Sequence, residues 1–335
     1  MPRTWSSASG PSLCVGAFLS CIPCAMAQEV ASSAAPEAPD RIGAAFALVE
    51  LLEESEQAQL MRDFNDPERH GWSFFPARRS SLRIGDLDDE ERGALVDFLE
   101  VALGENGLNR VREVRAVEPI TDRGGGVVTG PDECHLTFFG PISSSGPWGW
   151  RLEGHHIALN QTLVGSKLIA VTPSFLGSAP VRNEDGLEPL GREVRLARFS
   201  VEQLDGDLRD QVMEEDVPRE IVTGMNVDWE QPRRQGASLA ELPATIRQQL
   251  RLLARTHASV HADDAVRTFL ASWDATDPAK IHFVWFGPLT EKGPHGYRLQ
   301  GPEWVMEYVN HQGGANHVHT VWRTLEGEFI PIASR

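Results

Sequence analysis

The chain has 335 residues, of which 31 are Lys or Arg and 48 are Asp or Glu, so its formal net charge at pH 7 is −17. This acidic balance argues against binding to nucleic acid or to an anionic membrane, because both attract basic surfaces. Hydrophobic residues make up 41% of the chain, and a chain of this length can bury a sizeable core.

The first 27 residues have the pattern of a cleaved export signal. Arg3 supplies a positive charge, an apolar run spans Leu13 to Ile22, and Ala25 to Ala27 fit a small-x-small cleavage site. We predict cleavage near Ala27 and release into the periplasm or the medium. A lipoprotein acylated at Cys21 or Cys24 is the alternative. Residues 28–39 are expected to form a disordered N-terminus.

Cleavage would also change the charge and the cysteine content. It leaves 30 basic and 48 acidic residues, a net charge of −18, and Cys134 as the remaining cysteine. An internal disulfide is then excluded, so a hydrophobic core has to stabilise the fold.

Helical patterns precede each of two β-rich regions. Apolar residues at helical spacing predict helices over Arg41 to Met61, Asp86 to Leu103 and Asp263 to Trp273. The patterns Ser200 to Leu204 and Ser238 to Leu242 each place Gln or Glu three residues after Ser, and they predict two further helix starts.

The β-rich regions repeat each other at an offset of 147 residues. His135 to Gly154 and His282 to Gly301 align without a gap, and ten of the twenty positions are identical. We therefore predict an α+β protein that is internally duplicated. Its halves, residues 40–180 and 181–335, each consist of helices followed by an antiparallel meander, and they pack about a pseudo-twofold axis as one compact unit.

Positions that match between the halves are candidates for the scaffold. Arg151 and Arg298 are expected to make ion pairs or carbonyl contacts, and His135 and His282 to contact neighbouring loops. The Gly-Pro pairs at 140–141 and 287–288 are expected to end the first strand of each meander, because proline cannot continue a hydrogen-bonded ladder.

Positions that differ between the halves are candidates for function. His155 and His156 correspond to Pro302 and Glu303, and His317 and His319 correspond to Ala170 and Thr172. We therefore expect a His-His pair on one strand and a His-x-His pair on another. The strand with the His-x-His pair aligns with Ile169 to Phe175, which has no histidine.

Residues two apart in a strand share a face, so His317 and His319 can bind the same ligand. Neighbouring residues point to opposite faces, so only one of His155 and His156 joins the site unless a bulge turns both, and we favour His156. Glu307 is a candidate carboxylate ligand, with Glu303 and His311 as alternatives. Such a donor set suits zinc, iron, copper or manganese.

The resulting hypothesis is a metal-dependent hydrolase whose metal activates a water molecule. Asn316, Arg323 and Asn160 are candidates to stabilise the developing negative charge. Two alternatives stay open from the sequence: a non-catalytic protein that binds a small molecule between the halves, and a scaffold whose histidines are structural.

The segments around the histidine motifs resemble a known bacterial family. "GPWGWRLEGHHIALN", "TPSFLGSAP" and "GYRLQGPEWVMEYVNHQGGANHVHTVWR" are similar to the domain-of-unknown-function family numbered thirty-five hundred. The resemblance covers about residues 40–325. It implies an exported protein with Gly-His-His and Asn-His-x-His-x-x-Trp-Arg motifs, and it implies no particular activity.

Overall fold

The computed structural model describes residues 40–225 and 231–329, and these described residues belong to one compact unit. The predicted signal peptide and disordered N-terminus, residues 1–39, lie outside the described residues. None of the described helices is long and apolar enough to cross a membrane.

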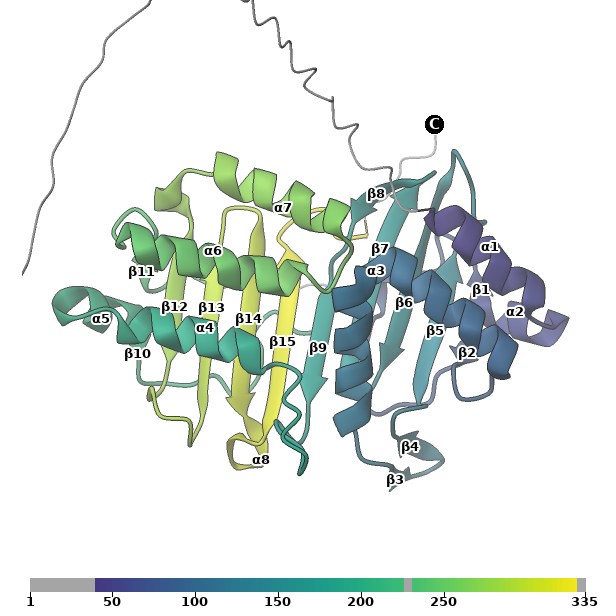
Figure 1. Cartoon of the computed structure of the whole chain (residues 1–335), viewed down its shortest axis with the longest axis horizontal. Helices are drawn as coiled ribbons and strands as arrows, with labels where there is room; N and C mark the ends of the chain where they lie inside the picture. Colours follow the sequence, from purple (N-terminus) through teal and green to yellow (C-terminus); the bar gives the residue numbers. More distant parts are fainter. Residues whose placement is uncertain (1–39, 226–230, 330–335) are drawn as a thin grey trace, which may run out of the picture. The chain divides into compact units, whose positions relative to one another are not determined.

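The fold is α+β, with eight α-helices and one large sheet in the part of the chain that the structure describes. The α-helices are α1 (Arg41–Leu51), α2 (Glu54–Leu60), α3 (Asp89–Val117), α4 (Gly191–Glu202), α5 (Gly206–Val212), α6 (Ala244–Ala258), α7 (Asp263–Ala275) and α8 (Gln312–Ala315). Figure 1 shows helices α1, α3, α4, α6 and α7 covering the same face of the sheet.

Thirteen strands form the large sheet, and most of their pairings are antiparallel. The first part of the chain supplies β1 (Met61–Arg62), β2 (Leu82–Arg83), β5 (Cys134–Phe139), β6 (Pro147–Gly154), β7 (Ile157–Val164), β8 (Lys167–Ala170) and β9 (Ser174–Ser178). The second part supplies β10 (Met213–Glu214), β11 (Ala237–Ser238), β12 (His282–Phe286), β13 (His295–Gln300), β14 (Trp304–His311) and β15 (His317–Thr324). A separate hairpin joins β3 (Thr121–Gly124) to β4 (Val127–Thr129).

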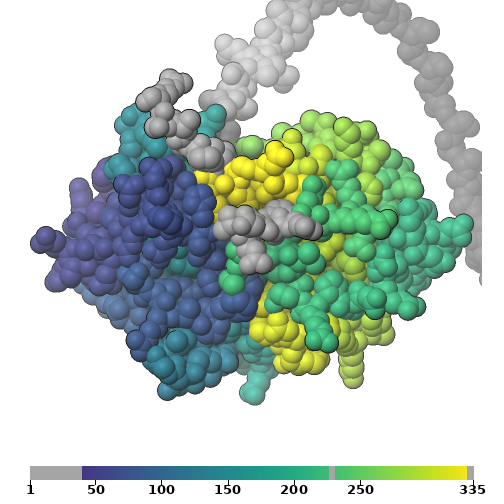
Figure 2. Space-filling view, turned by 180° about the vertical axis from the view of Figure 1, so that it is seen from behind, coloured from purple at the N-terminus to yellow at the C-terminus, as the bar shows by residue number. Residues whose placement is uncertain are grey.

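The strand order runs symmetrically outward from the centre of the sheet. It is β1-β5-β6-β7-β9-β15-β14-β13-β12-β10, so β9 and β15 are the central pair. The outer strands β1 and β10 each pair in parallel with the first strand of a meander, β5 and β12. Seen from behind, Figure 2 shows the purple-to-blue residues on one side and the green-to-yellow residues on the other.

The pairing registers of the two meanders agree at the 147-residue offset. Leu152 faces Leu159 between β6 and β7, and Leu299 faces Met306 at the corresponding place between β13 and β14. In the central ladder Ser174 pairs with Trp322, and Phe175 pairs with Val321. At the 147-residue offset Ser174 corresponds to Val321 and Phe175 to Trp322, so each pair corresponds to the other. Strands β5 and β12 end at Phe139 and Phe286, directly before the Gly-Pro pairs, as predicted.

The two faces of the sheet have separate hydrophobic cores. The larger core lies between the sheet and the helices and includes Trp150, Phe98 and Trp322. The smaller core lies on the other face, where Phe175 of β9 and Val321 of β15 pack with Trp72, Phe74, Ile221 and Phe329 of the connecting segments. Adjacent residues 321 and 322 therefore enter different cores, as alternation along a strand requires.

The two arginines that match at the 147-residue offset make contacts of the kind that the sequence predicts. Arg151 donates to the Glu68 carbonyl and pairs with Glu153 at 3.0 Å, and Arg298 pairs with Glu307 at 3.0 Å. His135 contacts the Ser81 carbonyl oxygen through Nδ1 at 3.0 Å. These contacts confirm a scaffold role for the three residues.

Several predicted element boundaries are wrong. The helix expected over residues 41–61 is two helices, because Leu52 is extended and Glu53 begins α2 with a capping box. Ser200 begins no helix; it lies in the last turn of α4, where its hydroxyl donates to the Leu196 carbonyl. Ser238 lies in β11 and contacts Glu241, whereas α6 begins at Ala244.

The segment Ile169 to Phe175 is not one strand. Strand β8 ends at Ala170 and β9 begins at Ser174, with Pro173 between them. Proline lacks the backbone N–H that a continuous ladder requires. The counterpart β15 has no proline and runs unbroken from His317 to Thr324.

Candidate metal centre

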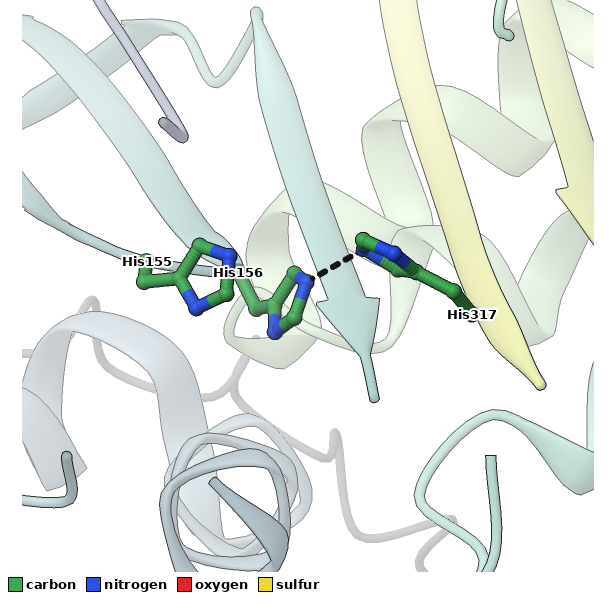
Figure 3. A group of neighbouring side chains, drawn as sticks. All are labelled: His155, His156 and His317. Carbon is green, nitrogen blue, oxygen red and sulfur yellow. Dashed lines mark hydrogen bonds between the residues drawn. The ribbon is translucent and has the colours of Figure 1, made fainter. Parts of the chain in front are cut away.

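The two histidine motifs meet at one end of the sheet. His155 and His156 are the two turn residues between β6, which ends at Gly154, and β7, which begins at Ile157. His317 is the first residue of β15, and β9 runs between that residue and the turn. Figure 3 shows both turn histidines facing His317 across β9.

The turn corrects the prediction that His155 and His156 lie on a strand and point to opposite faces. His156 has a φ of 67°, in the left-handed region that non-glycine residues seldom adopt. The strict alternation of a strand does not apply to such a turn, and the two rings lie side by side with their centroids 3.7 Å apart. Both histidines therefore reach the same site.

Three of the predicted ligands form a compact group. One potential ligand atom each from His155, His156 and His317 lies within 4.8 Å of the other two. The closest pair is His156 Nε2 and His317 Nε2, at 2.8 Å. His156 is fully buried, whereas His155 and His317 are partly exposed, so the group is reachable from solvent on their side.

A buried carboxylate that the sequence did not identify orients two of these rings. Glu118 follows directly after α3, and its two oxygens contact His155 Nδ1 at 2.6 Å and His156 Nδ1 at 2.7 Å. Burial by itself favours the neutral acid, but the hydrogen bonds from both histidines lower the pKa of Glu118 to about 2. Glu118 is therefore ionised and accepts at both oxygens.

The Glu118 contacts determine which ring nitrogens can bind a metal. A carboxylate can only accept, so both imidazoles carry their proton on Nδ1 and present a lone pair at Nε2. The 2.8 Å contact then has His317 Nε2–H donating to His156 Nε2. Carboxylates that hold histidine Nδ1 in this way are typical of metal-ligating imidazoles.

The fourth predicted histidine has a carboxylate of its own. His319 Nδ1 contacts the two Glu220 oxygens at 2.7 and 2.8 Å, and Gln312 donates to the same carboxylate. Burial opposes ionisation of Glu220, yet the hydrogen bond from His319 lowers its pKa. The His319 ring centroid is 4.6 Å from that of His317, but His319 lies outside the group of three.

Two of the three histidines have the protonation state that metal binding requires. Burial lowers the pKa of His156 to about 3, although Glu118 opposes the shift and His155 adds to it. Burial, followed by the nearby His319 and His155, lowers the pKa of His317 to about 4. Both rings are therefore neutral at pH 7, and neutral imidazole is the form that binds metals.

The other predicted site residues have different partners. Glu307 does not join the group, because its carboxylate accepts from Arg298 and from the backbone and hydroxyl of Thr223. The amide nitrogen of Asn160 donates to the Pro173 carbonyl.

Of the remaining two predicted residues, one lies directly before β15 and the other lies near the end of that strand. The carbonyl oxygen of the Asn316 side chain accepts from the Val181 backbone, and Asn316 itself is exposed directly beside His317. Arg323 is buried and donates to Glu328 and to the carbonyl oxygens of Thr223 and Gly224. Among the four predicted site residues that are not histidines, only Asn316 is both exposed and next to the histidine cluster.

A glycine in the central strand permits the rings to approach each other. A Cβ atom on Gly177 of β9 would lie 2.7 Å from His156 Cδ2 and 2.9 Å from His319 Cδ2. We therefore expect Gly177→Ala to displace the rings and to lower the free energy of unfolding by about 1–3 kcal/mol, the usual effect of overpacking.

Gly93→Ala in α3 is the control for Gly177→Ala, because nothing lies within 4 Å of the Cβ that it would add. It is expected to stabilise the protein by about 0.5–1 kcal/mol, since glycine is unfavourable inside a helix. Urea unfolding measures both variants. Equal effects of the two substitutions would contradict the close approach at Gly177.

The fold and site define an α+β protein with a cluster of histidines, held by carboxylates, at one end of the central strands of its sheet. Residues 36–330 match the model of DUF3500, which is described as a protein of unknown function. The match covers nearly the whole chain, so the protein belongs to this family, as the resemblance predicted. No curated protein and no solved structure matches the chain.

Proposed function

We propose that the protein binds one divalent transition metal through His155, His156 and His317 and uses it to hydrolyse a small molecule. The observation that carries this proposal is the orientation of the imidazoles. Glu118 accepts from Nδ1 of two neighbouring rings, at 2.6 and 2.7 Å, so Nε2 of each ring carries a lone pair and no proton. A purely structural histidine pair has no need for this arrangement, whereas metal ligands commonly have it.

The donor set limits the metal and its chemistry. Imidazole nitrogens suit zinc, copper and iron, and manganese is acceptable where a carboxylate joins them. Three protein ligands with a further position for water are typical of catalytic zinc sites, where the metal makes bound water a nucleophile near neutral pH. His319 is the nearest further donor, and the exposed Asn316 is the neighbour best placed to contact a developing negative charge.

The wider biological setting is also part of the proposal. We propose export to the periplasm or the medium, on the basis of the residue 1–27 pattern, and a small-molecule substrate in place of nucleic acid or membrane. We also propose that the chain arose by duplication of one ancestral segment, and that the first of the two resulting halves ends near residue 180. The matching registers at a 147-residue offset support a duplicated origin.

Metal content is the first test of the proposed function. Purified protein, stripped with a chelator and then loaded with Zn²⁺, Fe²⁺, Cu²⁺ or Mn²⁺, should retain about one equivalent of one of them after desalting. His317→Ala should retain less than about a tenth of an equivalent, and His311→Ala, outside the group, should match the wild type. A wild type that retains no metal, or a His317→Ala variant that retains as much as the wild type, would refute the metal centre.

Turnover is a separate test, made on protein of known metal content. Metal-loaded protein should hydrolyse activated esters or phosphate esters, such as their p-nitrophenyl derivatives, faster than stripped protein or the His317→Ala variant does. Full metal occupancy with no metal-dependent turnover across such a panel would favour a non-catalytic binding protein.

A further inference from the structure

A cavity on the helix-covered face of the sheet lies apart from the histidine cluster. Its volume is about 430 Å³, within the range of small-molecule pockets. Helix α3 from the first part of the chain and helices α4 and α6 from the second part line it, and Figure 1 shows all three on the same face. Val318 belongs to the core on this face, and alternation along β15 places His317 on the opposite face, so the cavity and the cluster are separate.

Contacts between the three helices hold part of the lining in place. Arg110 of α3 forms an ion pair with Glu193 of α4 and donates to the Thr256 carbonyl of α6 at 3.3 Å. The side chains of Arg110 and Glu193 are mostly buried. A second ion pair in the lining joins Arg195 to Glu188 at 2.6 Å. These groups are ordered before any ligand arrives, which lowers the entropic cost of binding.

Two further arginines of the lining have no protein partner. Arg192 of α4 and Arg255 of α6 are exposed, and neither forms a hydrogen bond or an ion pair with another described residue. Of the acidic residues in the lining, Glu113 of α3 is the one that likewise has no partner in the described part of the chain. The unpaired charges are thus two positive and one negative, in a chain whose net charge is −17. This local excess of positive charge favours an anion over a cation.

The rest of the lining is mainly polar. Asn106 and Asn109 present exposed side-chain amides, and the apolar residues that line the cavity are Pro189 and Leu252. An amide can donate and accept hydrogen bonds, as a hydroxyl group can, so the two groups suit each other. The lining therefore fits a ligand whose body carries hydroxyl groups better than one with a large apolar body.

We propose that this cavity binds a small hydroxylated anion, such as a sugar acid or a sugar phosphate, whose charged group accepts hydrogen bonds from Arg192 and Arg255. Guanidinium groups match carboxylates and phosphates alike, because they donate two parallel N–H bonds. The amides of Asn106 and Asn109 contact the hydroxyl groups of the ligand. The site does not involve the histidine cluster, so it is independent of the proposed metal.

Three probes of similar size test the class of ligand on the full chain, treated with a chelator so that no metal acts on them. Gluconate carries a carboxylate, glucose 6-phosphate carries a phosphate and glucose is uncharged. Titration calorimetry at one ionic strength measures all three. At least one anion is expected to bind about tenfold or more tightly than glucose, because charge-assisted hydrogen bonds are the strong ones. The anion that binds more tightly identifies the charged group.

Substitution of the arginines tests the location. Arg192→Gln and Arg255→Gln should each weaken binding of the tighter anion at least about tenfold. The matched control is Arg267→Gln, which removes the same charge from an exposed position of α7 outside the cavity. It should leave the dissociation constant within about twofold of the wild-type value.

Glu113→Gln is expected to act in the opposite direction. It removes the unpaired negative charge from the lining, so it should tighten anion binding about two- to fivefold. A variant that folds poorly would not bind more tightly, so this gain reports the charge of the cavity.

Four outcomes would overturn the proposal. They are no saturable binding of either anion, glucose binding as tight as that of both anions, equal effects of Arg192→Gln and Arg267→Gln, and weaker anion binding in Glu113→Gln. His317→Ala should bind the tighter anion as the wild type does, because the two sites lie on opposite faces of the sheet.

Discussion

Replacing Glu118 with glutamine is expected to weaken metal binding by about 10- to 100-fold, although the substitution hardly changes the size of the side chain. The carboxylate accepts from Nδ1–H of both His155 and His156. A glutamine amide can accept at its oxygen only, and its NH₂ group requires a lone pair on the second ring. That ring must then carry its proton on Nε2, which removes one metal-binding nitrogen from the site.

The control for Glu118→Gln is Glu105→Gln, at an exposed position of helix α3, which Glu118 directly follows. Competition with a fluorescent chelator measures the dissociation constant of each variant for the metal that the wild type retains. Circular dichroism at the same pH checks that both variants are folded. If Glu118→Gln is folded and binds the metal as tightly as the wild type, Glu118 does not position metal ligands.

The general architecture could be predicted because the repeat is strong. The twenty-residue match at the 147-residue offset covers β5 and β6 in the first part of the chain and β12 and β13 in the second. The same comparison identified Arg151 and Arg298 as scaffold residues. The order of β9 and β15 at the centre was not predictable, since it depends on contacts between residues about 150 positions apart.

Local patterns failed where tertiary contacts decide the structure. The Ser200 pattern has the spacing of a capping box, but the buried face of α4 places Ser200 inside the helix, where its hydroxyl donates to the Leu196 carbonyl. At Leu52 the chain leaves the helical conformation, and a new helix begins after Glu53, whose backbone N–H donates to the Glu56 side chain. Spacing alone does not distinguish these cases.

The site was predictable only in part. The differences between the two matching parts of the chain identified all four histidines. They did not identify the carboxylates that contact these histidines, which belong to Glu118, directly after a long helix, and to Glu220, in a loop. Neither residue lies in a recognisable sequence motif, so nothing in the sequence distinguishes them from the other acidic residues, of which the chain has 48 in all. Glu307 lies outside the cluster: residue 307 of β14 pairs with Val321 of β15, and His319 lies between Val321 and His317 along that strand.

Two histidines outside the site are expected to make the protein sensitive to acid. His257 and His261 are buried, and burial lowers the pKa of each to about 3, with Arg110 adding to the shift for His257 and Arg41 for His261. In the unfolded chain both return to about 6.5. The unfolded state therefore binds more protons below pH 6.5, and stability falls as the pH falls from there toward 3.

The hydrogen bonds of both rings explain why they stay neutral. Thr320 donates to the Glu307 carbonyl, so its oxygen can only accept from His257 Nδ1, at 3.4 Å, and the Tyr297 hydroxyl donates to Nε2, at 2.8 Å. Gln161 and Ser174 occupy the two nitrogens of His261. A second proton on either ring would require one of these partners to turn away.

The expected change in stability is large for so few groups. Each histidine should lower the free energy of unfolding by about 2 kcal/mol between pH 7 and pH 5, because one proton is taken up on unfolding over most of that range. Urea unfolding of chelator-treated protein at half-unit pH steps measures the slope. His261→Asn should reduce the slope below pH 6 by about 1.4 kcal/mol per pH unit, whatever its effect on stability at pH 7.

The slope distinguishes a buried neutral histidine from a residue that merely packs well. A packing role predicts that His261→Asn shifts the whole stability curve down without changing its pH dependence. His311→Asn, in which the substituted ring is only half-buried at the end of β14, serves as the matched control. If wild-type stability is flat between pH 7 and pH 5.5, the buried rings of His257 and His261 are not held neutral by the fold.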